Sequence, residues 1–376
     1  MLKDFFENYI YPIATLSGSI IGVGFLSLPY ITLQVGVSAM FFYFIGLTFL
    51  IVCLHVIFGK ICLKTPDFRR WPGFVGFYLG KWPKAIVLVS TTLGLFGVLL
   101  VYLIIGAQFL QAVASPVFGG TPMHYAGLFF IAASLFVYLG VKMISRIDLF
   151  ALVILGVILL IILIKGFFKI ELSNIFWTAS FSAGGLKALF LPYGAIMFSL
   201  WGTGLIPETE EMVRGSKKSL KKIIVIATLI PAVIYLAFIF LILGITGSQT
   251  TDSALLGLKN VLGDGLTSVA LFIGVITTFI AFIAQGLLLK KIFIYDMGVK
   301  EFPAWVLVCF TPLILFLLGF NSFINLISFV GGILLGIDGL LIMLIYKKIG
   351  GRPTVVYPLM LVFILGIVYS VIYFTT

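Results

Sequence analysis

The chain contains 376 residues, of which 62% are hydrophobic and only 10% are charged. Soluble domains are about 25% charged and disordered chains are poor in aromatic residues, so this composition excludes both classes. The net charge of +11 would suggest a nucleic-acid partner in a soluble protein, but here the charges lie between long apolar runs. We therefore predict an all-α polytopic membrane protein whose environment is the lipid bilayer and which binds no nucleic acid.

Apolar runs of about 20 residues, long enough to cross a bilayer, recur along the whole chain. Eleven spans are predicted, at residues 10–32, 35–58, 85–114, 123–141, 148–168, 188–206, 223–245, 264–289, 303–319, 323–346 and 355–374. The connection at 60–84 mixes aromatic and basic residues, which is typical of a helix lying along the membrane interface.

The basic residues predict the orientation of these spans. With the N-terminus inside, all but four of the 24 Lys and Arg residues fall on the inner side, the exceptions being Lys165, Lys169, Lys187 and Lys259. Because short cytoplasmic loops are enriched in Lys and Arg, we expect a multi-pass protein of the plasma (inner) membrane. Eleven spans place its N-terminus inside and its C-terminus outside.

Glycine interrupts two of the spans at corresponding places. Residues 17–29 of the first span read SGSIIGVGFLSLP, and residues 198–208 of the sixth read FSLWGTGLIPE. The two interruptions lie about half a chain apart, in spans of opposite direction, as an inverted repeat requires. We predict one transmembrane domain over 1–376, with five-helix repeats at 8–170 and 185–347 and an extra span at 353–376. Interrupted helices at matching positions of two repeats indicate a transport site near the bilayer midplane.

The chemistry of a helix break suits an amino acid. A break exposes amide N–H groups that attract a carboxylate and carbonyl groups that attract an ammonium group or Na⁺. An α-amino acid carries both charges on one carbon, so two opposed breaks match it. The alternative is that the glycines only allow close helix packing, since Gly18 and Gly22 form a small-xxx-small pair.

These residues resemble the amino acid–polyamine–organocation superfamily of permeases, most closely its amino acid/auxin permease branch. The family's first-span pattern is matched by Gly18, Ile21, Gly22, Gly24, Leu26, Leu28 and Pro29. Its sixth-span pattern is matched by Phe198, Gly202, Pro207 and Glu208, while Leu200 replaces the second aromatic residue. Residues 97–106 are similar to the third span, in which a tyrosine, here Tyr102, borders the substrate.

The resemblance implies the leucine-transporter fold and assigns roles to particular residues. It implies that the substrate carboxylate is held by amides around Ile21, Gly22, Val23 and Gly24. Carbonyl groups around Ser199, Leu200 and Gly202 are expected to bind the amino group. The side-chain pocket or its gate is expected to be formed by Trp201, Thr203 and Tyr102.

Two adjacent threonines, Thr277 and Thr278, lie in the middle of span 8. The resemblance implies a Na⁺ site between these hydroxyl groups and span 1 carbonyls, near Gly18 and Ile21, and Na⁺ prefers oxygen ligands. Alternatively, each threonine bonds a carbonyl of its own helix. Proton-coupled relatives carry a mid-span lysine in span 5, whereas Lys165 lies near the outer end. The sequence therefore favours Na⁺ over H⁺ as the coupling ion.

Three further polar residues have alternative interpretations. Asp338 in span 10 is costly to bury in lipid, by about 2.5–3.5 kcal/mol on insertion scales. It either binds a proton, acts as an inner gate, bonds a neighbouring hydroxyl group, or lies in water that penetrates from the inner side. Glu208 is either an inner-gate acid or an ordinary loop charge. His55 in span 2 is expected to be a packed, hydrogen-bonded histidine rather than a proton relay.

We expect a secondary active transporter that moves a small or neutral/aromatic amino acid by alternating access, coupled to Na⁺. The alternatives are a proton-coupled permease and a nutrient sensor on the same fold that does not transport. An enzyme is not expected, because the sequence has two histidines and neither clustered acids nor a Cys/His ligand set. No cofactor beyond the coupling ion and no obligate protein partner is expected.

Overall fold

The computed structural model describes residues 6–140, 156–157, 160–161, 164, 166–176, 188–213, 217–262 and 265–375. Every regular element in these residues is helical. Most of the predicted span 148–168, with Lys165, lies outside the described residues, as does Lys187.

The first predicted span is a broken helix. A π-helical turn, η1 (Phe6–Ile10), leads into α2 (Tyr11–Ile20), and the chain continues through a 3-10 turn, η2 (Val23–Ser27), into α3 (Leu28–Val35). The two parts are bent by 49° relative to each other. The first half then continues with α4 (Val37–Lys64), α5 (Trp71–Leu79), α6 (Lys81–Phe118), α7 (Pro122–Leu139), η3 (Phe167–Lys169) and α9 (Leu172–Phe176).

The sixth span is broken as well. α11 (Leu191–Leu200) is followed by a 3-10 turn, η4 (Thr203–Leu205), and by α12 (Ile206–Met212). The helical chain therefore runs past residue 206, where the sequence pattern ended the span. The remaining elements are α13 (Lys217–Thr246), η5 (Gly247–Gln249), α14 (Leu255–Leu262), α15 (Gly265–Lys291), η6 (Ile292–Asp296), α16 (Glu301–Leu317), α17 (Phe323–Phe329), η7 (Val330–Leu334), α18 (Leu335–Lys348) and α19 (Pro353–Thr375).

Local sequence explains several of these boundaries. α3, α11 and α12 each have a proline in the first helical turn, where a missing N–H costs nothing. The chain reverses between α3 and α4 at Gly36 (φ 87°) and between α5 and α6 at Gly80 (φ 97°). These left-handed conformations favour glycine.

The membrane-spanning character of the chain is confirmed. Seven helices among the described residues are long and apolar enough to cross a membrane, and the bent pair Phe6–Ile20 and Val23–Val35 makes up to eight. The apolar helix Glu301–Leu317 is shorter. Within the predicted interfacial connection at 60–84, a helix forms at α5.

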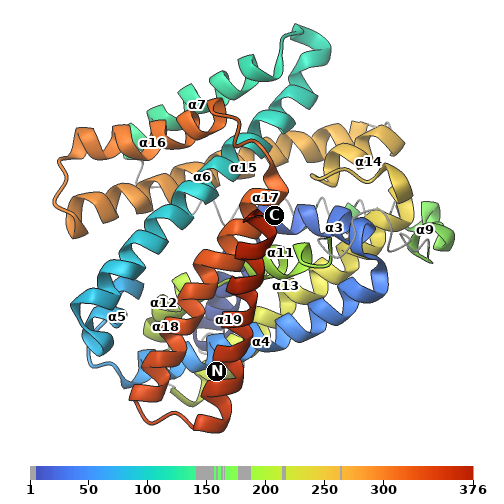
Figure 1. Ribbon diagram of the computed structural model, residues 1–376. Coiled ribbons are helices and arrows are strands. Elements are labelled where there is room, and N and C mark those ends of the chain that lie inside the picture. The colour runs from blue at the N-terminus through green and yellow to red at the C-terminus, as the bar shows by residue number, and fades with distance from the viewer. Residues whose placement is uncertain are drawn as a thin grey trace.

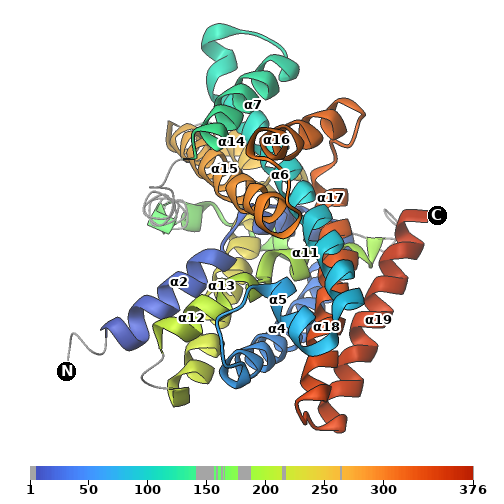
Figure 2. The same cartoon turned by 90° about the vertical axis from the view of Figure 1, so that its left-hand side faces the viewer.

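The helices form two groups, and the cavity described below lies between them. α6, α7, α15 and α16 pack together, and α7, α15 and α16 lie in the upper part of both views, which α6 reaches from its start beside α5; α2, α4, α11 and α13 lie below them (Figures 1 and 2). α18 and α19 run side by side and contact the lower group through α4. The broken span 1 and η4 thus come to lie opposite α6 and α15.

Candidate functional site

The first helix break occupies Ile21 and Gly22. The last bond of α2 runs from the Ile21 amide to the Ser17 carbonyl (3.1 Å). Ile21 (φ −75°, ψ 92°) and Gly22 (φ −118°, ψ −174°) are then extended, a conformation that any residue can adopt. Gly22 faces the Tyr102 hydroxyl, since a Cβ on Gly22 would lie 3.7 Å from that oxygen, in ordinary van der Waals contact.

The second break occupies Trp201 and Gly202. Trp201 (φ −72°, ψ 120°) leaves the helical conformation directly after α11. In a continuous helix the Gly202 amide would donate to the Phe198 carbonyl, four residues earlier. It donates instead to Nε2 of His55 on α4, at 3.1 Å.

The two breaks pack directly against each other. A Cβ on Gly24 would lie 2.6 Å from Cδ1 of Phe198 and 2.9 Å from Oγ of Ser199. Reciprocally, a Cβ on Gly202 would lie 2.6 Å from Cγ1 of Ile20, at the end of α2. Real Cβ atoms are not found that close to other atoms, so each glycine is required by the approach of the other span. Close packing and the breaks therefore occur together at these glycines.

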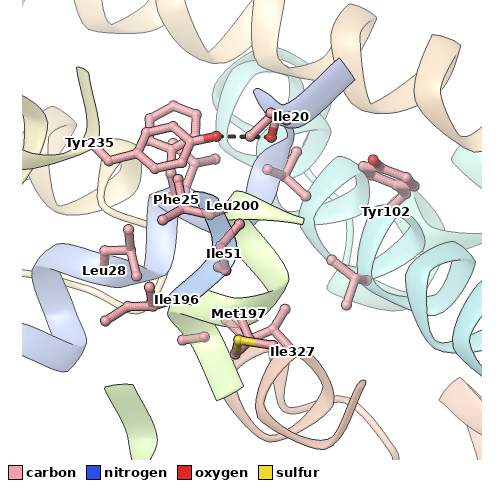
Figure 3. Packing of buried hydrophobic residues seen from close by; sticks show 14 of the residues in the cluster. Ile20, Phe25, Leu28, Ile51, Tyr102, Ile196, Met197, Leu200, Tyr235 and Ile327 are labelled. Atoms are coloured by element: carbon pink, nitrogen blue, oxygen red, sulfur yellow. Dashed lines mark hydrogen bonds between the residues drawn. The ribbon is translucent and has the colours of Figure 1, made fainter. Parts of the chain in front are cut away.

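A tyrosine that sequence reasoning missed joins the two breaks. Tyr235 on α13 is fully buried, and its hydroxyl oxygen lies 2.9 Å from the Ile20 carbonyl oxygen and 3.2 Å from that of Ser199. Its ring stacks on Phe25 with 5.0 Å between centroids. Figure 3 shows the hydroxyl directed at Ile20, with Tyr102 on the other side of this segment. The available signal was a single phenol within the apolar run 223–245.

His55 is buried and hydrogen-bonded, as predicted. Its Nδ1 lies 3.0 Å from the Thr228 hydroxyl on α13, and its Nε2 accepts the Gly202 amide. The ring also packs edge-on against Trp201, with centroids 6.4 Å apart. His55 therefore contacts the second break directly, which the sequence did not indicate.

A cavity of about 230 Å³ lies beside the first break. Six of the predicted site residues line it: Gly18, Ile21, Gly22, Val23, Tyr102 and Thr277. Trp201 and Gly202 of the second break do not line this cavity, although Leu205 at the end of η4 does. The predicted substrate and ion residues that do not line it are Gly24, Ser199, Leu200, Trp201, Gly202, Thr203 and Thr278.

The rest of the cavity wall combines apolar and uncharged polar groups. Phe109 on α6 and Leu255 on α14 are apolar, and Gln285 on α15 adds a carboxamide two helical turns beyond Thr277. The segment before α14 is tied to span 1, because the Ala254 amide donates to the Leu26 carbonyl (3.2 Å). Such a wall suits a ligand with an uncharged side chain. Phe109, Leu255 and Gln285 were not predicted, because nothing in their local sequence marks them.

The two threonines proposed for the ion have different surroundings. Thr277 borders the cavity, and its hydroxyl donates to the Gly274 carbonyl at 3.0 Å. Thr278 is fully buried, with its hydroxyl 2.8 Å from the Gly274 carbonyl and 2.9 Å from that of Val275. Both hydroxyl groups therefore make the bonds to their own helix that the sequence left open as the alternative. A hydroxyl oxygen that donates in this way keeps lone pairs for a cation.

The two acidic candidates lie away from the cavity. Asp338 on α18 is 7% exposed, and the Ser90 hydroxyl on α6 lies 3.3 Å from its Oδ1. A neighbouring hydroxyl thus bonds Asp338, as one of the interpretations required. Glu208 lies in α12, and its Oε2 is buried without a hydrogen-bond partner among the described residues.

A family model described as "Transmembrane amino acid transporter protein" matches residues 9–345. Glutamine transporter 2 of Aliivibrio fischeri (strain ATCC 700601 / ES114) is 23% identical over 250 residues, which cover 63% of this chain and 61% of that transporter. The aligned part is therefore less than two thirds of that relative's length.

Solved transporter structures share the fold. MhsT in complex with L-phenylalanine aligns with a TM-score of 0.61 and 16% identity over 97% of both chains. The Eremococcus coleocola manganese transporter gives a TM-score of 0.64 at 13% identity, over 99% of this chain and 87% of its own. Mhp1, a nucleobase-cation-symport-1 family transporter with bound bromovinylhydantoin, gives a TM-score of 0.62 at 13% identity, over 96% of this chain and 89% of its own. The leucine-transporter fold expected from the resemblance is confirmed.

Proposed function

Because the chain belongs to the transmembrane amino acid transporter family, we propose that it is a secondary active permease that moves a neutral amino acid across the membrane by alternating access. The observation that carries this proposal is the cavity of about 230 Å³ against the unwound backbone of Ile21 and Gly22, with Tyr102 facing Gly22. Unwound backbone within a membrane is tolerated where it lines a cavity, because its polar groups need partners there.

In this proposal the substrate carboxylate binds the amides at Ile21–Gly24, and the Tyr102 hydroxyl contacts the same end of the substrate. The amino group binds carbonyl groups of the second break. The Ser199 carbonyl is already within reach of Tyr235, so this role falls first to Leu200 and Gly202. Since neither residue lines the cavity, they reach the substrate when the two spans move apart. Trp201 and Thr203 move with them as part of the gate.

The substrate class follows from the size and lining of the cavity. A volume of about 230 Å³ lies below the roughly 300–1,000 Å³ of pockets for drug-sized ligands, which favours a compact amino acid over a bulky aromatic one. The carboxamide of Gln285 supplies a polar partner for an uncharged polar side chain. Among the two amino acids that the similar proteins name, L-glutamine fits this cavity better than L-phenylalanine.

We propose Na⁺ as the coupling ion, bound between the hydroxyl groups of Thr277 and Thr278 and the carbonyl groups of Gly18 and Ile21. Support comes from Thr277, Gly18 and Ile21, which border the same cavity. The proton is the second candidate because Asp338 is a buried carboxylic acid beside Ser90. The distribution of basic residues supports an inner-membrane protein with its N-terminus inside and its C-terminus outside.

Uptake of labelled amino acids into proteoliposomes tests these proposals. We expect L-glutamine to accumulate when an inward Na⁺ gradient is imposed, and we expect less accumulation with a pH gradient alone. Accumulation driven by a pH gradient and abolished by Asp338→Asn would assign coupling to the proton instead. Saturable binding of an amino acid without uptake under any gradient would identify a sensor. No binding and no uptake across the twenty amino acids would contradict the proposed function.

A further inference from the structure

The buried hydrogen bonds of His55 fix the position of its proton. The Gly202 amide can only donate, so the Nε2 atom that lies 3.1 Å from it must carry a lone pair. The Thr228 hydroxyl lies 2.8 Å from the Ile224 carbonyl, to which it gives its single hydrogen, so its oxygen accepts from Nδ1 of His55 at 3.0 Å. Two independent contacts therefore require the same form, a neutral imidazole with its proton on Nδ1.

This form of His55 keeps the second break open. A buried amide left without an acceptor is destabilising, so the Gly202 N–H must find one. The acceptor that a continuous helix offers is the Phe198 carbonyl. By accepting the amide itself, His55 removes the bond that would rewind the chain across Trp201 and Gly202. The carbonyl groups before the break then stay available to another donor.

Thr228 acts on the break through His55. Without its oxygen, the Nδ1 proton has no acceptor at this position, and only the Gly202 contact still disfavours the tautomer with the proton on Nε2. That tautomer places an N–H against the Gly202 N–H, so the bond to the break is lost. The contact is enclosed, because a Cβ on Gly202 would lie 3.3 Å from Cε1 of His55 and His55 is fully buried.

We infer that His55 is a positioning residue for substrate binding: as a neutral imidazole with its proton on Nδ1, fixed by Thr228, it holds the Gly202 amide and keeps span 6 unwound. The consequence for substrate binding rests on the proposed transport function. The protonation state of His55 does not rest on that function, so the two consequences are tested separately.

The tautomer is tested by nitrogen NMR on protein labelled with ¹⁵N-histidine. The chain has two histidines, so His124→Gln leaves His55 as the only signal. Glutamine is a common residue at the helix position that His124 occupies in α7, so the fold should be retained. We expect one neutral imidazole with its proton on Nδ1, and loss of that single state in Thr228→Val. A proton on Nε2, or an imidazolium, in the protein with Thr228 intact would overturn the inference whether or not the protein transports.

The effect on substrate binding is tested with two amide variants of His55. The Gln carboxamide extends to about the position of Nε2, whereas the shorter Asn carboxamide reaches only about the position of Nδ1. We expect His55→Gln to keep the KM of L-glutamine uptake within about threefold. His55→Asn should raise it about tenfold, the equivalent of 1.4 kcal/mol, with a smaller change in the maximal rate. The KM of Thr228→Val should rise as it does in His55→Asn, and the KM of Thr228→Ser should stay close to that of the natural protein.

Thermal unfolding in detergent separates positioning from folding. Equal melting temperatures for the Gln and Asn variants with different KM values would support the inference. Equal KM values for Gln and Asn would overturn it, whatever their stability. If neither variant folds, Thr228→Val against Thr228→Ser supplies the same comparison. If the natural protein moves no amino acid, the proposed function fails, and the NMR result still decides the state of His55.

Discussion

The hydroxyl oxygen of Tyr235 lies 2.9 Å from the carbonyl oxygen of Ile20, the last residue of α2 before the first break. The same oxygen lies 3.2 Å from the carbonyl oxygen of Ser199, one residue before the end of α11. One side chain from a third helix thus holds the ends of both half-helices. The relative placement of the two breaks depends on this phenol.

Tyr235→Phe should weaken substrate binding. The change removes the single hydroxyl hydrogen that the two buried carbonyl groups share, at a cost of about 1–3 kcal/mol, and allows the breaks to move apart. We expect the KM of uptake to rise by about tenfold or more. Tyr125→Phe is the matched control, since the Tyr125 hydroxyl also donates to a backbone carbonyl, that of Gly119, outside the cavity lining. Equal KM values for the two variants would refute the role of Tyr235.

Gly24→Ala should damage the protein far more than Gly204→Ala. A Cβ on Gly24 would lie 2.6 Å from Phe198, whereas a Cβ on Gly204 meets nothing within 4 Å. Overpacking of this kind costs about 1–3 kcal/mol, and here it would separate the two breaks. We expect Gly24→Ala to lose most uptake and to unfold at a lower temperature, and Gly204→Ala to resemble the natural protein. Comparable uptake by both variants would show that the breaks need not touch.

Thr277→Ala should reduce Na⁺ dependence if the ion binds where we propose. The Thr277 hydroxyl borders the cavity, while Thr278 is fully buried. We expect Thr277→Ala to raise the Na⁺ concentration for half-maximal uptake about tenfold, and Thr277→Ser to restore it, because serine keeps the oxygen ligand. Uptake by the double variant Thr277→Ala/Thr278→Ala should no longer depend on the Na⁺ concentration. An unchanged Na⁺ response in the double variant would favour the proton.

Stability should depend on pH through Asp252, which lies in the connection before α14. Burial raises the pKa of its carboxyl group, although the Ser253 amide donates to it at 2.9 Å. Between the ordinary carboxyl pKa of about 4 and this raised pKa, the folded state binds more protons than the unfolded state. The free energy of unfolding therefore falls as the pH rises through that window. Asp252→Asn should remove this fall in thermal unfolding measured from pH 4 to 7.

Glu301 provides a control, because its pKa is shifted in the opposite direction to that of Asp252. A hydrogen bond from Lys290 (2.8 Å) lowers the pKa of this exposed carboxyl group, which precedes the predicted span 303–319. Its contribution is present above the ordinary carboxyl pKa and is lost as the pH falls through the lowered one. Glu301→Gln should therefore lower the free energy of unfolding at neutral pH. The decrease in this free energy with rising pH that we assign to Asp252 should remain. If Asp252→Asn left the pH profile unchanged, burial of Asp252 would not contribute to it.

Most of the predicted spans and both breaks coincide with helices and helix breaks among the described residues because they depend on local physics, while most of the span 148–168 lies outside those residues. A run of apolar residues must form its backbone hydrogen bonds within one helix in lipid, and a run such as Gly22-Val23-Gly24 weakens that helix locally. The positions of the breaks could therefore be predicted from the sequence. In span 6 the chain stays helical to Met212, past the predicted end at 206, because the apolar run stops at the acidic residues of α12 whereas the helix does not.

The sequence by itself determined the class of protein, the spans, the breaks and the resemblance to amino acid permeases, because apolar length and glycine placement are properties of neighbouring residues. Only the tertiary structure decided which groups meet the breaks. It brought Tyr235 to Ile20, His55 to Gly202 and Tyr102 to Gly22, and it placed Gln285 and Phe109 in the cavity. These contacts join residues far apart in the chain, and their geometry is set by how the helices pack, which the local sequence of each helix does not specify.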